Sequence, residues 1–191
     1  MYTLFLDTHD KDVIVIIYKD GKIVGKKDIV SNNKHSQVTL PAIVEVLEDV
    51  KLDINDMENV IVVNGPGSFT GERIAVTIAK TVAYCLHTPI RTINSLLVMA
   101  LSLDKEDKYV ALEDRNGAFV GHFDINNKLV DKMVYLNKSS YLEYKNKNDV
   151  ITEVNIDYEK VYDYVMNNID SLNPHEVKPL YIKGISALND K

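Results

Sequence analysis

Residues 60–73, VIVVNGPGSFTGER, decide how this chain folds. The first four are apolar and mostly β-branched, which is typical of a buried strand. Three glycines and a proline follow, and apolar residues then recur at helical spacing through Leu86. Many phosphate sites have this order of strand, glycine-rich loop and helix. The stretch therefore predicts an α/β fold, and its loop either holds a nucleotide or only makes a tight turn.

The hydrophobic pattern around this stretch extends the α/β prediction. The chain is expected to open with an antiparallel meander of three strands. Three runs of strand-favouring residues follow one another, and a hairpin turn at Lys19-Asp20-Gly21 separates the second from the third. These strands are expected at residues 2–6, 13–18 and 22–30. Helices are expected at residues 36–50, 71–86 and about 95–102, with strands at residues 59–63 and 90–93. The two longer helices are apolar over more than one side, so each should be covered on two faces.

A charged break at residues 105–108 divides the chain into a first unit, 1–104, and a smaller second unit, 105–191. In the second unit, strands are expected at residues 109–112, 118–124, 128–136 and 150–153, and helices at residues 139–144 and 157–169. The apolar residues 178–182 are expected to dock back on the body of the protein.

Composition excludes several classes of protein. A net charge of -6 argues against a chain that grips nucleic acid alone, which needs clustered lysine and arginine. The single cysteine, Cys85, excludes a disulfide framework and favours the reducing cytoplasm, and its apolar surroundings predict that it is buried. No signal peptide is expected, and no apolar run approaches the roughly 20 residues of a membrane span.

The glycine loop matches neither common phosphate motif. A Walker loop ends in Gly-Lys-Ser/Thr, whereas this loop ends in Gly71-Glu72-Arg73, and its glycine spacing is one residue too long for a dinucleotide fingerprint. Glu72 suits a helix amino terminus but would repel a phosphate there. Thr70 is the expected cap of the helix. Two interpretations of the loop therefore stay open: a tight turn shaped by the glycines and Pro66, and a nucleotide site.

Other polar residues give weaker signals. The five histidines stand far apart in sequence, so they form no metal-binding pair, and no metal is expected. Asp7 and Asp10 could hold a cation, although aspartates at a strand end more often form a turn. The charged run 113–115, EDR, is either an intramolecular ion pair or a ligand contact, and the ion pair is favoured. Its Arg115 is one of only three arginines in a lysine-rich chain.

Five segments together resemble the TsaB (also called YeaZ) family. The most specific is GPGSFTG at residues 65–71 followed by Arg73. The others are LFLDT at residues 4–8, HSQ at residues 35–37 with Leu40-Pro41, Asp114-Arg115, and PLYI at residues 179–182. Three features depart from the family: His9 replaces a small hydroxyl residue, the spacing around Glu113-Asp114-Arg115 is unusual, and the second half is short.

The resemblance implies an actin/Hsp70/sugar-kinase-like (ASKHA) fold of two α/β subdomains, the second one abbreviated. It implies a cytoplasmic role in making threonylcarbamoyladenosine beside the anticodon of tRNA. TsaB proteins are partners, not catalysts: TsaD transfers the threonylcarbamoyl group, and TsaE is the associated ATPase. The family implies a TsaD heterodimer, TsaE in a larger complex, tRNA contact only through that complex and no membrane. Residues 93–99 lack the histidines of the TsaD metal motif.

The resemblance also assigns residues. No catalytic residue and no tightly bound cofactor are expected, while weak ATP or ADP binding at a shared interface stays open. The residues of that loop site are Asp7, Thr8, Gly65, Pro66, Gly67, Ser68, Thr70 and Arg73. The interface with TsaD is expected on the two long helices, at Val38, Ala42, Val46, Ala75, Ala79 and Ala83. On this assignment, Ala79→Glu would abolish pairing without unfolding the chain.

Rival functions remain. A small ATP-dependent kinase of the same fold would need a catalytic aspartate and an adenosine pocket in the second half, whose short length speaks against it. A metalloprotease would need the missing pair of metal ligands. The apolar helices could also pair with a second copy of the chain, giving a homodimer when TsaD is absent.

Overall fold

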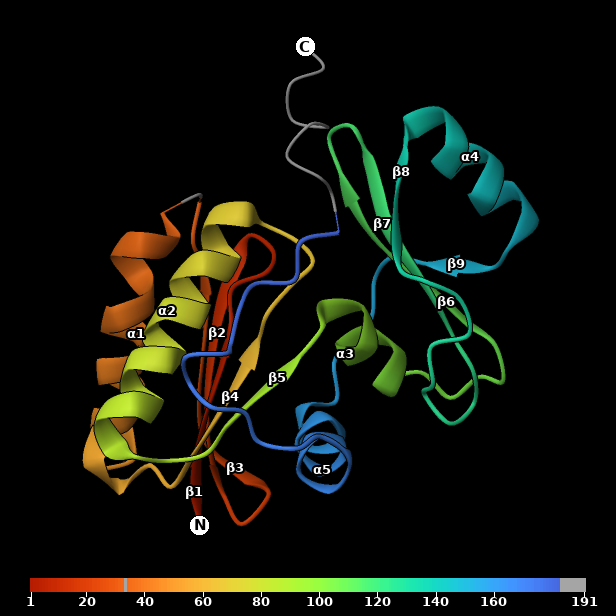
Figure 1. The fold of residues 1–191 in the computed structure, drawn as a ribbon. Coiled ribbons are helices and arrows are strands. Elements are labelled where there is room, and N and C mark those ends of the chain that lie inside the picture. The colour runs from red at the N-terminus through yellow and green to blue at the C-terminus, as the bar shows by residue number, and fades with distance from the viewer. Residues whose placement is uncertain (33, 183–191) are drawn as a thin grey trace.

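The computed structural model describes residues 1–32 and 34–182 and contains two β-sheets (Figure 1). The first sheet has the order β3-β2-β1-β4-β5. Its strands are β1 (Tyr2–Asp7), β2 (Asp12–Lys19), β3 (Lys22–Val30), β4 (Asn59–Val63) and β5 (Ile90–Ile93). Strands β1, β2 and β3 are antiparallel, whereas β4 and β5 run parallel to β1. This confirms the predicted opening meander and the α/β class.

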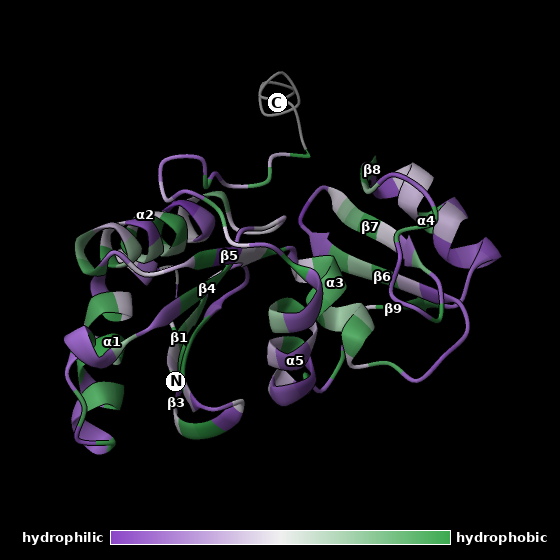
Figure 2. Cartoon of the chain, turned by 60° about the horizontal axis from the view of Figure 1, so that its bottom comes forward, coloured by the Kyte–Doolittle hydropathy of each residue, from purple (hydrophilic) through white to green (hydrophobic). Residues whose placement is uncertain are grey.

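Helices cover both faces of the first sheet (Figure 1). One face packs against α1 (His35–Asp49) and α2 (Phe69–Leu86), and the other against α3 (Ser95–Leu101) and α5 (Tyr158–Asn168). Strand β1 is apolar at consecutive positions because Leu4 and Leu6 point to the first helix pair and Phe5 to the second. Figure 2 shows α1 and α2 banded in hydrophobic and hydrophilic residues, as expected of helices that bury one face.

The second sheet is smaller and has the order β8-β7-β6-β9. It consists of β6 (Lys108–Asp114), β7 (Gly117–Phe123), β8 (Val134–Asn137) and β9 (Val150–Ile151), with α4 (Lys138–Lys147) packed against it. A short 3-10 helix, η1 (Ile54–Asp56), precedes β4. Within the described residues, no helix is both long and apolar enough to cross a membrane.

The second unit differs from the sequence prediction at its third strand. Only Val134–Asn137 pairs along β7, whereas residues 128–133 make a single bridge, between Leu129 and Phe123. Leu129 and Val130 are 42% and 51% exposed, so Met133 is the one apolar residue of this run that packs against a core. Strand β9 is likewise shorter than predicted. The alternating pattern of apolar and polar residues did not by itself show that most of these side chains would stay exposed.

The carboxy-terminal part of the chain returns to the first sheet. Helix α5 packs on it, and Tyr18 donates its hydroxyl to the carbonyl of Tyr158 at 2.9 Å. Further along, the N–H of Leu172 bonds the Ile90 carbonyl and the N–H of Leu180 bonds the Asn64 carbonyl. Val177 is 1% exposed in the core under α1 and α2. The predicted docking of residues 178–182 is therefore confirmed.

The residues assigned to the partner interface need correction. Five side chains are fully buried inside the chain's own core, namely Ala42, Val46, Ala75, Ala79 and Ala83. Val38 is half-buried and packs against the same core. The small alanines let α1 and α2 lie close to each other and to the sheet, because little side chain stands between the backbones. They do not form an outer surface.

Cys85 also differs from its prediction, because it is exposed on α2. It stands two residues after the buried Ala83 and therefore on another side of the helix. The apolar residues next to Cys85 in the sequence therefore did not determine whether its side chain is buried.

Replacing Ala79 by glutamate should unfold the protein rather than block a surface. The new carboxylate would lie in a fully apolar core, and its desolvation should lower the free energy of unfolding by about 3 kcal/mol or more. Thermal unfolding followed by circular dichroism measures this. Val44→Glu is the matched control, since Val44 is 53% exposed on the neighbouring helix. Equal stability of the two variants would contradict the packing described.

Candidate functional site: the glycine loop and the cleft beside it

The glycine loop, residues 64–71, lies directly against the connection between β1 and β2. The N–H of Ser68 donates to the carbonyl of His9 at 2.6 Å, and the hydroxyl of Thr8 donates to the carbonyl of Gly71 at 2.6 Å. From the other side, the N–H of Ser95 donates to the Gly65 carbonyl at 2.9 Å. The loop is thus held between the first strand connection and the start of α3.

Two of the loop's glycines are required by this close approach. A Cβ at Gly67 would lie 2.1 Å from the carbonyl oxygen of His9, and one at Gly71 would lie 2.0 Å from that of Thr8. Both obstacles are backbone atoms and cannot rotate away. Gly65 precedes a cis peptide bond to Pro66 and has a positive φ of 106°. The glycines therefore allow two backbone segments to pack closely. This agrees with the turn interpretation of the sequence.

Helix α2 begins two residues earlier than predicted, and Ser68 is its cap. The Ser68 hydroxyl accepts a hydrogen bond from the N–H of Gly71 at 3.2 Å. Thr70, the expected cap, is exposed in the first turn of the helix. Thr and Ser have similar capping ability, so only the backbone path decided between them.

Three ionisable side chains meet beneath the loop. Oδ1 of Asp7 accepts the backbone N–H of His9 at 3.1 Å and lies 2.5 Å from Nδ1 of its ring. Glu72 is 2% exposed, and its carboxylate lies against the α-carbon side of Gly65. We call Asp7, His9 and Glu72 the buried triad; its two acids are buried, and the side chain of His9 is 16% exposed. The triad places two acids and one base where the loop meets the end of β1.

The buried triad has perturbed protonation equilibria. Burial raises the pKa of Glu72 to about 7, and the charge of His9 and the backbone N–H of Gly67 oppose that rise only in part. Burial alone would lower the pKa of His9, but the Asp7 carboxylate outweighs it, so the pKa of His9 is raised. Near neutral pH, Glu72 is therefore divided between its two forms, and the Asp7 carboxylate favours the protonated form of His9.

This arrangement is unfavourable for a phosphate at the loop. The N–H groups of Ser68 and Gly71 already donate to protein acceptors, and the carboxylates of Asp7 and Glu72 stand close behind them. A phosphate site at a helix amino terminus needs free N–H donors and no competing negative charge. The predicted weak nucleotide contact stays a prediction, and the loop geometry does not favour it.

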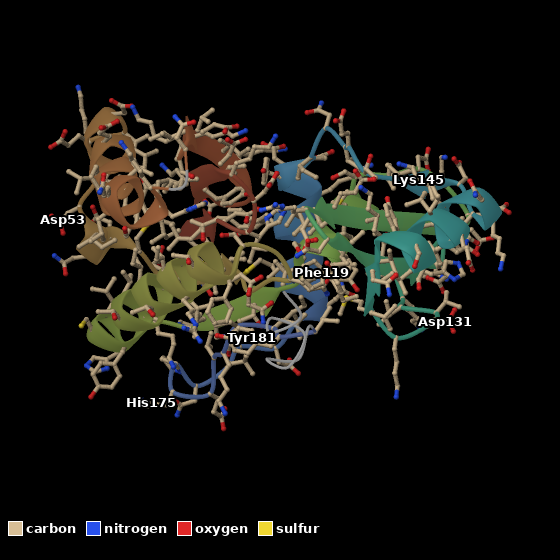
Figure 3. The ribbon with its side chains drawn as sticks, turned by 90° about the horizontal axis from the view of Figure 1, so that it is seen from above. Asp53, Phe119, Asp131, Lys145, His175 and Tyr181 are labelled. Carbon is tan, nitrogen blue, oxygen red and sulfur yellow. The ribbon has the colours of Figure 1, made fainter. Side chains whose placement is uncertain are left out.

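Arg73 does not reach the loop site. Its guanidinium stacks over the Phe69 ring at 3.8 Å, and its Nε donates to the hydroxyl of Tyr181 at 2.9 Å. Figure 3 shows Tyr181 beside α2, far from Asp53 and near the loop end of the helix. Arg73 therefore fastens the carboxy-terminal segment to α2. Of the predicted site residues, Asp7, Thr8, Gly65, Pro66, Gly67 and Ser68 come together, whereas Thr70 and Arg73 point elsewhere.

A cleft of about 550 Å³ adjoins the loop, between the two sheets. One wall includes His9, Gly67 and Ser68, and the other includes Phe119 and Glu113. Figure 3 shows Phe119 at the junction of the two halves.

The charged run at the end of β6 is largely committed to intramolecular bonds. Glu113 accepts from the Tyr141 hydroxyl at 2.7 Å and pairs with Lys145 at 3.1 Å. Asp114 accepts from the Tyr135 hydroxyl at 2.7 Å. The favoured ion-pair interpretation is therefore confirmed for Glu113.

Two members of the buried triad were not among the predicted site residues. Glu72 stands three and seven residues before Ala75 and Ala79, so helical spacing places it on the buried side of α2. That spacing could have marked it as a buried acid. His9 was recognised only as an unusual residue, and nothing in sequence places its ring against Asp7. Within the described residues, no three histidine, cysteine or acidic side chains converge as metal ligands.

Comparison with known proteins gives one family match and several relatives. A model of the family described as "TsaD: tRNA N6-adenosine threonylcarbamoyltransferase" matches residues 28–119. The tRNA threonylcarbamoyladenosine biosynthesis protein TsaB of Bacillus subtilis is 28% identical over 70% of this chain and 60% of its own length. The protein of the same name from Buchnera aphidicola (subspecies Schizaphis graminum) is 33% identical over 51% of this chain and 46% of its own. The matched part thus spans about half the length of these relatives.

The fold is matched over nearly the whole chain. The structure of YeaZ from Pseudomonas aeruginosa superposes with a TM-score of 0.78 at 16% identity, covering 94% of this chain and 100% of that one. With the strand order β3-β2-β1-β4-β5 and the second, smaller sheet, this confirms the predicted ASKHA fold.

Replacing Gly71 by alanine should strongly destabilise the protein. The new Cβ would meet the Thr8 carbonyl, so the loop and the β1–β2 connection must separate, and the free energy of unfolding should fall by about 2 kcal/mol. Urea denaturation measures the loss. Thr70→Ala, in the same turn, should change stability by less than about 0.5 kcal/mol because Thr70 is exposed and caps nothing. A larger loss for Thr70→Ala would contradict this assignment.

Glu72 should make the protein less stable as pH rises. Its pKa is about 7 in the folded chain and 4.5 ordinarily, so the folded state binds the proton more tightly. Its contribution is complete below about pH 4.5 and is lost as pH rises through about 7. His9, with a raised pKa, adds to the loss above its ordinary value.

The Glu72→Gln variant tests this effect, because glutamine keeps the shape but cannot ionise. Its melting temperature should fall less between about pH 5 and pH 8 than that of the parent protein. Glu48→Gln, at an exposed position of α1, should keep the parental slope. Equal slopes for Glu72→Gln and the parent would contradict the burial of a titrating carboxyl group.

Proposed function

Because the chain belongs to the TsaB (YeaZ) family, we propose that it acts in the cytoplasm in making threonylcarbamoyladenosine in tRNA, as a non-catalytic partner of TsaD. The relative from Bacillus subtilis carries the name of this pathway. The proposal assigns the chain an assembly role: it pairs with TsaD, meets TsaE in a larger complex, and approaches tRNA only through that complex.

The observation that carries the proposal is an apolar outer surface on α1. Leu40 and Val44 are 56% and 53% exposed, and with the exposed Pro41 they follow helical spacing on the side of α1 away from the sheet. We call these three residues the outer α1 surface. Large apolar side chains grouped on one face are typical of protein interaction sites.

Helix α2 lies beside α1 and extends this surface (Figure 1). Its residues Ile74, Ile78 and Val82 are half-buried and recur every four positions, so they form one row along the helix. Two neighbouring helices with apolar outer rows suit a partner that adds helices of its own, forming a bundle. The buried alanines contribute indirectly, because they set α1 and α2 close together.

The glycine loop supports a role without catalysis. The N–H groups of Ser68 and Gly71 are bonded within the chain, and the nearest carboxylates, those of Asp7 and Glu72, are buried. A kinase-like enzyme would instead need an open anion site at this loop. We therefore propose that the loop positions α2 for pairing, and that any nucleotide contact is secondary and shared with the partner.

Pairing is tested by size-exclusion chromatography with light scattering, on the chain alone and mixed with TsaD of the same genome. We expect a heterodimer that replaces a monomer or a homodimer formed through the same helices. Val44→Glu should abolish it while the protein stays folded, because a charge would then be buried at the interface. Leu142→Glu is the control, since Leu142 is 61% exposed on α4 in the second unit.

Two results would contradict the proposal. One is normal pairing by a folded Val44→Glu protein, which would move the interface elsewhere. The other is no complex at all together with ATP turnover by the isolated chain, which would favour the kinase-like function.

A further inference from the structure

The cleft between the two sheets is strongly acidic. Its part beside β1 and β2 is lined by five carboxylates: Asp7, Asp10, Asp12, Asp28 and Glu153. It shares His9, Asp10 and Glu153 with the part beside the glycine loop, so the two parts are continuous. We call the whole the acidic cleft. The lysines along it are Lys11 and Lys26, and Lys26 already pairs with Asp28 at 3.4 Å.

Two carboxylate oxygens of residues that line this cleft are buried and have no hydrogen-bond partner among the described residues. They are Oδ2 of Asp7 and Oδ1 of Asp12, and the Asp7 side chain as a whole is only 3% exposed. Both residues line the cleft. A buried charged oxygen without a donor is costly, and native structures rarely leave one unexplained. A ligand that brings a positively charged donor would remove this cost.

The rest of the lining tells which kind of cation the cleft suits. Apolar side chains of Val98, Met99 and Ile156 lie beside the carboxylates. A divalent metal ion needs several converging ligands, and the described residues offer no such group of three. A lysine or arginine side chain instead needs an apolar surface for its stem and carboxylates for its head.

One lysine of the chain already binds in this manner. Nζ of Lys26 lies 4.8 Å above the centre of the Tyr158 ring and is held by Asp28. Both Tyr158 and Asp28 line the acidic cleft. The cleft therefore combines carboxylates with aromatic and aliphatic walls, which is the chemistry that recognises basic side chains.

We propose that the acidic cleft binds a lysine- or arginine-containing segment of a protein partner, with basic side chains reaching Asp7 and Asp12. Part of the cleft is lined by Val98 and Met99 of α3 and by Tyr158 of α5, on the sheet face opposite α1 and α2. A partner on the outer α1 surface and a basic segment in the cleft can therefore bind together. The inference does not depend on pairing with TsaD.

The test uses fluorescence anisotropy with a labelled tetra-arginine peptide at about 0.15 M salt, where long-range attraction to an acidic protein is screened. We expect saturable one-to-one binding to the full chain. The variant Asp12→Asn/Glu153→Gln removes two cleft charges and should weaken binding at least tenfold. The matched variant Glu48→Gln/Glu176→Gln removes two exposed charges outside the cleft and should weaken it less than twofold.

The single variant Asp12→Asn guards against a folding defect, because it replaces an unpartnered carboxylate by a neutral group of the same shape. It should weaken binding of the peptide about fivefold without lowering the melting temperature of the protein. Equal weakening by the two double variants, or no saturable binding, would overturn the proposal. A third result would also overturn it: magnesium chloride raises the melting temperature of the parent protein but not that of Asp12→Asn, and the peptide does not bind. That result would indicate a metal site.

Discussion

The direct contact between the glycine loop and the β1–β2 connection is the constraint on which the rest of this structure depends. Two backbones meet there with no side chain between them, at Gly67 against His9 and at Gly71 against Thr8. The contact fixes where α2 starts and how it crosses the sheet. Because α1 packs beside α2, it also fixes the spacing of the two helices that carry the apolar outer surface.

The same contact explains the electrostatics of the loop. Closing the loop on the strand connection buries Asp7 and Glu72, and burial raises the pKa of Glu72 although His9 opposes that rise. A loop of this shape could serve a phosphate in another chain, but here the N–H groups of Ser68 and Gly71 bond to the protein's own acceptors. Negative charge instead continues from Asp7 into the acidic cleft. Binding through the helices and binding in the part of the cleft beside α3 and α5 thus use separate faces of one sheet.

Much of the fold could be predicted from the sequence, and the errors have a common cause. Strands β1 and β4 were placed nearly to the residue because both of their faces are buried, so their apolar runs are continuous. Residues 128–133 have a strand-like pattern, but all of them except Met133 are exposed, and they do not form a strand. The alanines of α2 were placed on a partner's side although they face the sheet. A pattern shows which residues avoid water, but not what covers them.

The sequence by itself determined the class, the strand order of the opening meander, the turn at the glycines and the family, because these depend on local periodicity and on residues with restricted conformations. Only the tertiary structure decided that Ser68 caps α2, that Arg73 holds Tyr181, and that Asp7, His9 and Glu72 meet in one buried triad. The cap depends on the path of the backbone, and the physical reason for the other two is distance along the chain. Burial and protonation depend on neighbours that are more than sixty residues apart in sequence and are brought together only by the packed loop.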